Sequence, residues 1–144
     1  MTHAFVAAQR LLARREHGAE ELRSKLLQKG HDASEVEAVI SECQRLGLQC
    51  DIRFAASFCR NRVRQGYGPL RIRQELQGKQ IDAELIDKTL CDTEHDWPSS
   101  AQAVWLKKFK GQKPDDFAKM QKQKQFMYYR GFSPDIIEQV IGKL

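Results

Sequence analysis

Apolar side chains recur three and four residues apart along most of the chain, which is the spacing that places them on one face of an α-helix. No stretch sustains the alternation of apolar and polar positions that a half-buried strand requires. Ala, Leu, Gln, Glu, Lys and Arg, all good helix formers, dominate between short turns that contain Gly or Pro. The pattern therefore predicts an all-α protein.

The helical pattern occurs three times. The stretches 32–40, 82–90 and 133–141 align without gaps at offsets of 50 and 51 residues. Each begins with a residue whose side-chain oxygen can cap a helix, and continues with two apolar residues four positions apart. The capping residues are Asp32, Asp82 and Ser133, and the apolar pairs are Val36/Ile40, Ile86/Leu90 and Ile137/Ile141. We expect these stretches to be the third helices of three equivalent units.

A second helix is expected before each of these stretches. Its apolar pair is Leu22/Leu26 in the first unit and Ile72/Leu76 in the second, whereas Gln123/Met127 in the third unit is a weaker match. Gly30, Gly78 and Gly131 are predicted to end these helices, because glycine adopts the left-handed conformation that often follows a helix. A leading helix opens each unit, at residues 4–15, 51–65 and 98–110.

The predicted domains are therefore three three-helix repeats, at residues 1–50, 51–95 and 96–144, with nine helices in all. A unit of this size is near the lower limit for a self-sufficient core. Stacked repeats contact mainly their neighbours, so we expect an elongated, curved array.

The chain carries 24 Lys and Arg against 19 Asp and Glu, a net charge of +5, but this charge is unevenly distributed. Residues 52–80 contain seven cations and one acid, and residues 105–131 contain eight cations and two acids, so each stretch is +6. Residues 32–51 and 82–96 are acidic, at −4 and −5. This segregation favours a patterned surface that binds a polyanion, such as nucleic acid, or an acidic protein.

Helical geometry groups some of these cations. Arg53, Arg60 and Arg64 fall within about 40° of one another at 100° per residue. Arg62 points into the apolar arc of the same helix, either as an ion pair with a carboxylate such as Glu75 or as a ligand contact. Lys119, Lys122 and Arg130 form a second stripe, with Phe126 among them. Each stripe is either a solvated helix face or a binding surface.

Catalysis and cofactor binding are not supported by the sequence. There is no P-loop, HExxH or GxSxG motif, and the segment 66–69 (Gly-Tyr-Gly-Pro) is typical of a tight turn between helices, with Tyr67 either packed or displayed. The four cysteines, at positions 43, 50, 59 and 91, form no CxxC pair. We expect buried or half-buried free thiols, no metal and no enzyme activity.

No apolar run approaches the ~20 residues of a membrane helix, and no secretory signal follows Met1. We therefore expect a cytoplasmic protein that binds no membrane. With no coiled-coil seam in the sequence, a monomer is the default expectation.

Five segments form a characteristic combination of motifs: residues 11–17 (LLARREH), 53–58 (RFAASF), 66–69 (GYGP), 72–76 (IRQEL) and 129–133 (YRGFS). In this order they resemble the RecX family, the bacterial regulators of the RecA recombinase. The resemblance implies tandem three-helix repeats that bind in the groove of the RecA filament on single-stranded DNA. It also implies restraint of strand exchange, ATP hydrolysis and the coprotease activity that triggers the SOS response, with no cofactor. The third repeat matches the family only loosely between residues 97 and 117.

Two functions follow as hypotheses. The first is a regulator that lies along the RecA nucleoprotein filament; the alternative is a direct DNA-binding protein that uses its three-helix units like helix-turn-helix modules. The predicted filament or DNA contacts are Arg53, Arg60, Arg64, Tyr67, Arg71, Arg73, Lys107, Lys108, Lys119, Lys122 and Arg130.

Overall fold

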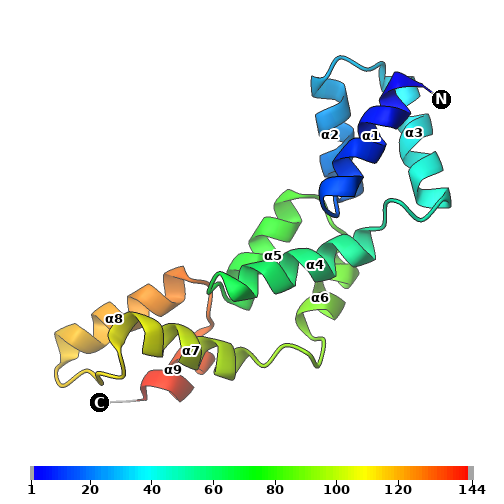
Figure 1. Cartoon of the computed structure of the whole chain (residues 1–144). Helices are drawn as coiled ribbons and strands as arrows, with labels where there is room; N and C mark the ends of the chain where they lie inside the picture. Colours follow the sequence, from blue (N-terminus) through cyan, green and yellow to red (C-terminus); the bar gives the residue numbers. More distant parts are fainter. Residues whose placement is uncertain (1, 143–144) are drawn as a thin grey trace.

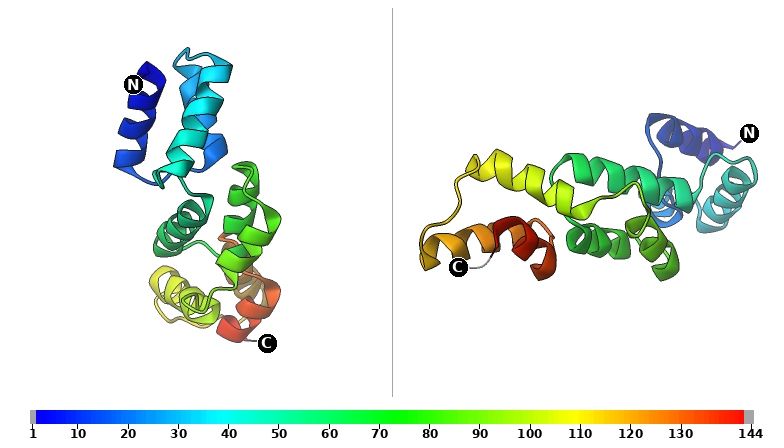
Figure 2. Two further views of the ribbon diagram at one scale, coloured as in Figure 1. Left: turned by 90° about the vertical axis from the view of Figure 1, so that its right-hand side faces the viewer. Right: turned by 90° about the horizontal axis from the view of Figure 1, so that it is seen from below.

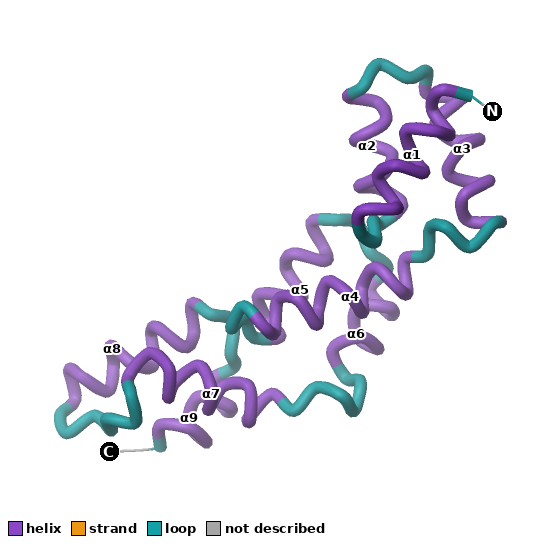
Figure 3. The backbone as a smooth tube through the Cα atoms, in the orientation of Figure 1, coloured by secondary structure: helices purple, strands orange, loops and turns teal. Residues whose placement is uncertain are grey.

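The computed structural model describes residues 2–142, which form nine α-helices and no strand (Figure 3). The helices are α1 (His3–Arg14), α2 (Ala19–Gln28), α3 (Ala33–Arg45), α4 (Asp51–Arg64), α5 (Pro69–Gly78), α6 (Ala83–Leu90), α7 (Trp97–Phe109), α8 (Phe117–Tyr129) and α9 (Pro134–Ile141). The all-α class and the three-helix periodicity expected from the sequence are confirmed.

The helices form three successive units, α1–α3, α4–α6 and α7–α9, which we call repeats 1, 2 and 3 (Figure 1). In each repeat the third helix packs on the first two, and each repeat has its own cluster of buried apolar side chains. Repeats 1 and 3 lie at opposite ends of a bent array (Figures 1 and 2). The accessible surface is 8917 Å², against about 7600 Å² for a compact monomer of this mass.

The three third helices begin as the sequence predicts. Asp32, Asp82 and Ser133 accept backbone N–H bonds from Ser34, Leu85 and Ile136, over 3.2, 3.4 and 3.3 Å. The apolar pairs of α3, α6 and α9 are all buried. Capping and apolar spacing therefore define the same three helices.

The helix α5 ends at Gly78, as the sequence predicts, but Gly78 does not supply the left-handed turn. Gly78 is the last helical residue, and the residue with left-handed backbone is Gln80 at φ 57°. Gln80 aligns with Gly30 at φ 90° and Gly131 at φ 102° in the other repeats. The turn geometry is thus common to all three repeats, although only two of them use glycine, the residue that adopts it without strain.

The weak sequence match at Gln123 has a structural reason. The Gln123 side chain is buried, accepts a hydrogen bond from Trp105 Nε1 over 2.8 Å and donates one to the Gln112 carbonyl over 2.9 Å. A polar residue replaces an apolar one here because the indole N–H and a loop carbonyl need partners inside the core.

Three of the cysteines match the expectation and one does not. Cys43 and Cys59 are buried and Cys50 is half-buried, but Cys91 is exposed because it lies just beyond the end of the short helix α6. Burial raises the pKa of the Cys59 thiol to about 12, so this thiol is protonated at neutral pH.

Repeats 1 and 2 are joined by a polar network. The Ala19 backbone N–H donates to Asp51 Oδ1 over 2.8 Å, and Gln49 Nε2 donates to the same oxygen over 2.9 Å and to the carbonyl of the buried His17 over 3.2 Å. Lys79 in repeat 2 lies 3.3 Å from Glu21 in repeat 1. These bonds fix the start of α4 against the start of α2.

Repeats 2 and 3 are joined backbone to backbone. The Gly68 N–H donates to the Arg130 carbonyl over 2.7 Å, and the Leu70 N–H donates to the Gly131 carbonyl over 2.8 Å. A Cβ on Gly68 would lie 2.6 Å from the Gly131 carbonyl carbon, and one on Gly131 would lie 2.7 Å from the Arg71 nitrogen. Only glycine at both positions permits this approach.

We predict that Gly131→Ala lowers the free energy of unfolding by about 3 kcal/mol, measured by urea denaturation. About 1–2 kcal/mol comes from placing a side chain in the left-handed region, and the rest comes from the collision with the Arg71 backbone.

Gly30→Ala is the matched control, because Gly30 occupies the same turn position in repeat 1 and a Cβ added there would meet nothing within 4 Å. It should cost only the strain of about 1 kcal/mol. Equal losses in the two variants would show that the Gly68–Gly131 contact does not contribute to stability.

The folded state should lose stability in acid, because of two groups near the junction between repeats 1 and 2. Burial lowers the pKa of His17, so the unfolded chain takes up this proton near pH 6.5, at a higher pH than the folded chain does. The free energy of unfolding should therefore fall as the pH is lowered from 7.5 to 5.5. Burial opposes ionisation of Glu21, but the Arg15 hydrogen bond and the Lys79 charge lower its pKa to about 2, which extends the loss below pH 4.5.

Urea unfolding at pH 7.5, 6.5 and 5.5 measures this dependence. His17→Gln is the control, since glutamine does not titrate; its stability should change less with pH than that of the wild type. The same pH dependence in both proteins would contradict the role of His17.

Candidate functional site

Four of the predicted contact cations are held in ion pairs within the molecule. Three of these cations pair with a carboxylate that lies far away in the sequence. The fourth, Lys119, pairs with Asp115, four residues earlier in the loop just before α8. The pairs are Arg53–Glu16 at 2.7 Å, Arg60–Glu94 at 3.2 Å, Arg73–Asp87 at 2.6 Å and Lys119–Asp115 at 2.9 Å. The intramolecular ion pairs hold these four side chains in place. Their contact with a partner stays a prediction.

Arg53 has a further structural role. Besides Glu16, its guanidinium donates to the Gly47 carbonyl over 2.7 Å, so it ties α4 to two loops of repeat 1. Arg60, two turns further along α4, pairs with Glu94 in the loop that leads to α7. The Arg53–Arg60–Arg64 stripe therefore follows the length of repeat 2, but only Arg64 lacks a carboxylate partner among the ion pairs of residues 2–142.

Arg62 forms an ion pair with Glu75, which is the first of the two alternatives that the sequence leaves open for it. Its Nε and Nη2 atoms donate to the two oxygens of Glu75 over 2.9 and 2.7 Å, a bidentate geometry that links α4 to α5. The side chains are 19% and 29% exposed, so this pair is shielded from solvent more than the other pairs of α4 are.

Tyr67 is packed rather than displayed. Its half-buried ring lies beneath three guanidinium groups, with the Arg62, Arg71 and Arg130 carbons 4.0, 4.3 and 5.1 Å from the ring centroid. Each contact is a cation–π interaction of about 0.5–1 kcal/mol at an exposed site. The ring thus gathers arginines from repeats 2 and 3 at the junction between them.

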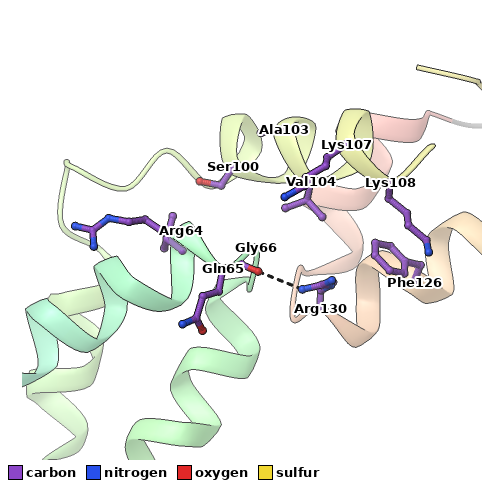
Figure 4. A pocket seen from close by; sticks show the side chains of 11 residues that line it. Arg64, Gln65, Gly66, Ser100, Ala103, Val104, Lys107, Lys108, Phe126 and Arg130 are labelled. Carbon is purple, nitrogen blue, oxygen red and sulfur yellow. Dashed lines mark hydrogen bonds between the residues drawn. The ribbon is translucent and has the colours of Figure 1, made fainter. Parts of the chain in front are cut away.

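A hollow of about 470 Å³ lies beside this junction, between the end of α4 and the faces of α7 and α8 (Figure 4). We call it the junction hollow. It is lined by Val63, Arg64, Gln65, Gly66, Ser100, Ala103, Val104, Lys107, Lys108, Phe126 and Arg130.

The junction hollow is strongly basic. Four of its lining side chains, Arg64, Lys107, Lys108 and Arg130, are cations and none is acidic. Lys108 and Arg130 lie 5.2 and 5.3 Å from the centroid of Phe126, and Arg130 also donates to the Gln65 carbonyl over 3.2 Å. Arg64 donates to Asn61 over 2.7 Å. In the described chain none of the four forms an ion pair with a carboxylate.

The expected stripe of Lys119, Lys122 and Arg130 is divided in the structure. Lys119 and Lys122 line a separate hollow of about 490 Å³ with Phe109, whereas Arg130, the residue that caps the end of α8, lines the junction hollow with Phe126. Their spacing still places the three cations along one face of α8, and their joint contact with a partner stays a prediction.

A third hollow, of about 720 Å³, contains the remaining predicted cations. It is lined in part by Arg71 and Arg73 from α5 and by Tyr128 and Tyr129 from the end of α8. Both tyrosines are highly exposed, at 54% and 67%. This hollow also contains Glu75, so its charge is mixed, unlike that of the junction hollow.

The contacts predicted from the sequence include Lys107 and Lys108 on the α7 wall of the junction hollow, but not Ser100, Ala103 and Val104 beside them. Ser100, Ala103, Val104 and Lys107 follow the i, i+3, i+4, i+7 spacing of one helix face, and two of them are small. This spacing was a usable signal for a recessed surface. The opposite wall, from α4, comes from another repeat and gives no such local signal.

Two further observations concern other classes of site. Within residues 2–142 no three His, Cys, Asp or Glu side chains are grouped so that they could hold a metal ion. The described helices include none that is both long and apolar enough to cross a membrane.

The fold is that of a tandem three-helix repeat protein, and this chain has a basic recess between repeats 2 and 3. Family models for the first, second and third three-helix domains of RecX match residues 4–43, 51–90 and 98–141. The chain belongs to the RecX family.

Individual relatives agree with this assignment. The chain is 49% identical over 144 residues to the regulatory protein RecX of Legionella pneumophila (strain Corby), covering all of this chain and 96% of the relative. It is 41% identical over 132 residues to the regulatory protein RecX of Pseudomonas entomophila (strain L48), covering 92% of this chain and 85% of the relative.

Solved structures show the same fold. A crystal structure of regulatory protein RecX superposes with a TM-score of 0.79 at 24% identity, covering 97% of this chain and 70% of that one. The crystal structure of RecX from Lactobacillus salivarius also gives 0.79, at 23% identity, and covers 96% of this chain and 92% of that one. At these identities the likeness is evidence of fold alone.

Proposed function

We propose that this chain is a cytoplasmic, monomeric regulator of the RecA recombinase that binds along the RecA filament on single-stranded DNA. Bound there, it restrains strand exchange, ATP hydrolysis and the coprotease activity that triggers the SOS response. It acts by binding and performs no chemistry of its own. The observation that carries the proposal is that all three repeats match RecX domains in order.

The shape of the molecule supports binding along a filament. Three repeats in a bent array offer three surfaces at fixed separations, as Figure 2 shows from two sides. A filament presents identical subunits at regular spacing, so a rigid array can engage several of them at once. Each contact can then be modest, because linked contacts raise overall avidity.

The charge pattern supports a partner that is part protein and part nucleic acid. Cations lie on α4, α5, α7 and α8, whereas α3 and α6 are acidic. A uniformly negative partner would be repelled by α3 and α6. A partner with both basic and acidic surfaces can match both signs, which sets register and speeds association.

The ten cations among the predicted contacts fall into two groups by their local partners. Arg53, Arg60, Arg73 and Lys119 already hold carboxylates, so a partner must compete for them or use their remaining N–H donors. The other six form no ion pair within residues 2–142 and offer the larger gain on meeting an anion: Arg64, Arg71, Lys107, Lys108, Lys122 and Arg130. We therefore assign the stronger anion contacts to the second group.

Addition of the purified chain to RecA on single-stranded DNA should lower both the ATPase rate and strand exchange. Its affinity for the filament should exceed that for the same DNA without RecA by tenfold or more. Steady-state ATP hydrolysis, D-loop formation and anisotropy of a labelled chain measure these effects. Equal affinity for bare DNA and filament would contradict the proposal.

Arg60→Glu/Arg73→Glu should weaken filament binding by at least tenfold, because two predicted contacts become repulsive. Arg10→Glu/Lys29→Glu is the control, since it makes the same charge change at exposed positions of repeat 1 outside the predicted contacts. The control should bind nearly as the wild type does. Equal loss in both variants would point to net charge rather than to these residues.

A further inference from the structure

The junction hollow differs from the other basic regions of the molecule. Its four cations come from both sides of the junction: Arg64 from α4, Lys107 and Lys108 from the last turn of α7, and Arg130 from the end of α8. Elsewhere Arg53, Arg60, Arg73 and Lys119 each face a carboxylate. Here four positive charges line one recess with no acidic side chain among its eleven lining residues.

Such an arrangement is poised for an anion. Like charges around one recess repel one another, and the low-dielectric walls of a cleft concentrate their field. Val63, Ala103, Val104 and Phe126 supply apolar walls to this hollow. A bound anion would relieve the repulsion among these cations, so this site gains more from an anion than a scattered set of surface lysines would. Arg64 lies at the α4 edge, and its guanidinium extends away from the other three (Figure 4).

Three of the four cations are already oriented. Arg130 is held by the Gln65 carbonyl and by the faces of Tyr67 and Phe126, Lys108 lies over Phe126, and Arg64 is held by Asn61. These contacts use a ring face, a carbonyl or an amide, so they leave the positive charge uncompensated. Side chains ordered before binding lose less conformational entropy when the ligand arrives.

Charge density favours a nucleic-acid strand over an acidic protein. A single strand carries one phosphate about every 3.4 Å. A strand that crosses a hollow of about 470 Å³ therefore brings about two phosphates within reach of the lining cations. An acidic peptide reaches this density only where Asp or Glu fills almost every position.

The surroundings favour one strand over a duplex. One turn before Arg64 on α4, Arg60 is already neutralised by Glu94. The loop that carries Glu94 also carries Asp92 and Asp96, both exposed. A duplex is wide enough to extend from the hollow over this acidic loop, whereas a single strand fits within the recess.

We infer that the junction hollow binds the phosphate backbone of a single nucleic-acid strand, with Arg64 on one wall and Lys107 and Lys108 on the other (Figure 4). Arg130 closes the recess at the junction itself. The inference deepens the proposed function, on which it rests for the identity of the strand: the DNA that the filament carries.

Binding of a fluorescent oligothymidylate of about 20 nucleotides, without RecA, tests the site directly. Anisotropy titrations from 25 to 200 mM salt compare the wild type with Arg64→Gln/Lys107→Gln. Two lost phosphate contacts should weaken binding about tenfold at low salt and reduce the slope of log K against log salt by about 1.4.

Arg10→Gln/Lys88→Gln is the matched control: it removes one exposed arginine and one exposed lysine away from the hollow. It should keep the wild-type slope to within about 0.3 if phosphate contacts alone set the slope. Circular dichroism of all three proteins checks that the helices are intact. An unchanged affinity and slope in Arg64→Gln/Lys107→Gln would overturn the inference.

Two competitors test the class of ligand. Oligoglutamate of equal charge and a 20-base-pair duplex should each displace the oligothymidylate at least tenfold less well than unlabelled oligothymidylate does. Equal competition by oligoglutamate would assign the hollow to an acidic protein, and equal competition by the duplex would overturn the single-strand assignment.

The same three proteins on RecA filaments separate this inference from the proposed function. If the wild type fails to bind or inhibit the filament while the hollow variant still loses oligothymidylate, the proposed function fails and the hollow stands as a strand-binding site. If the wild type inhibits RecA and the hollow variant binds oligothymidylate normally, the inference fails and the proposed function stands.

Discussion

Two backbone hydrogen bonds between repeats 2 and 3 determine how most of the functional surface is assembled. The N–H groups of Gly68 and Leu70 belong to the start of α5, where a helix has no internal acceptor for them. They find acceptors in the carbonyls of Arg130 and Gly131, at the end of α8. Each repeat has its own small core, so the buried apolar side chains alone do not set the angle between repeats. The backbone contact sets it, and it requires glycine on both sides.

The basic recess depends on that contact. One wall of the junction hollow belongs to repeat 2 and the other to repeat 3, so it exists only while the two repeats keep one orientation. Tyr67 acts at the same place, since its ring gathers guanidinium groups from both repeats that would otherwise repel each other. Repeat 1 is joined differently, through the Asp51 carboxylate, the Gln49 side-chain amide and the backbone carbonyl of the buried His17. The array is therefore held by two chemically distinct junctions, one made by side chains and one by backbone groups.

The local part of this architecture could be predicted from the sequence, and the non-local part could not. Helix starts at Asp32, Asp82 and Ser133 follow from capping and apolar spacing, which are properties of neighbouring residues. The Arg62–Glu75 pair lies 13 positions apart within one repeat and was also within reach. The Arg53–Glu16 pair and the two walls of the junction hollow join different repeats, and no periodicity within a repeat reports how repeats meet. A local feature can also escape prediction. Gln80 has the left-handed backbone of Gly30, but glutamine rarely adopts this conformation, so the residue type did not indicate the turn.

Hydrogen exchange of the Gly68 and Leu70 amides tests the central claim, that repeats 2 and 3 form one rigid unit, most directly. Both amides lie in a turn or the first turn of a helix, where exchange is ordinarily fast because no intrahelical acceptor is available. If the junction is rigid, both should be protected about as strongly as the central amides of α4 and α7, and should exchange only when a whole repeat unfolds. Fast exchange of both amides, in a protein whose helix centres remain protected, would show that the repeats move independently and would contradict the account.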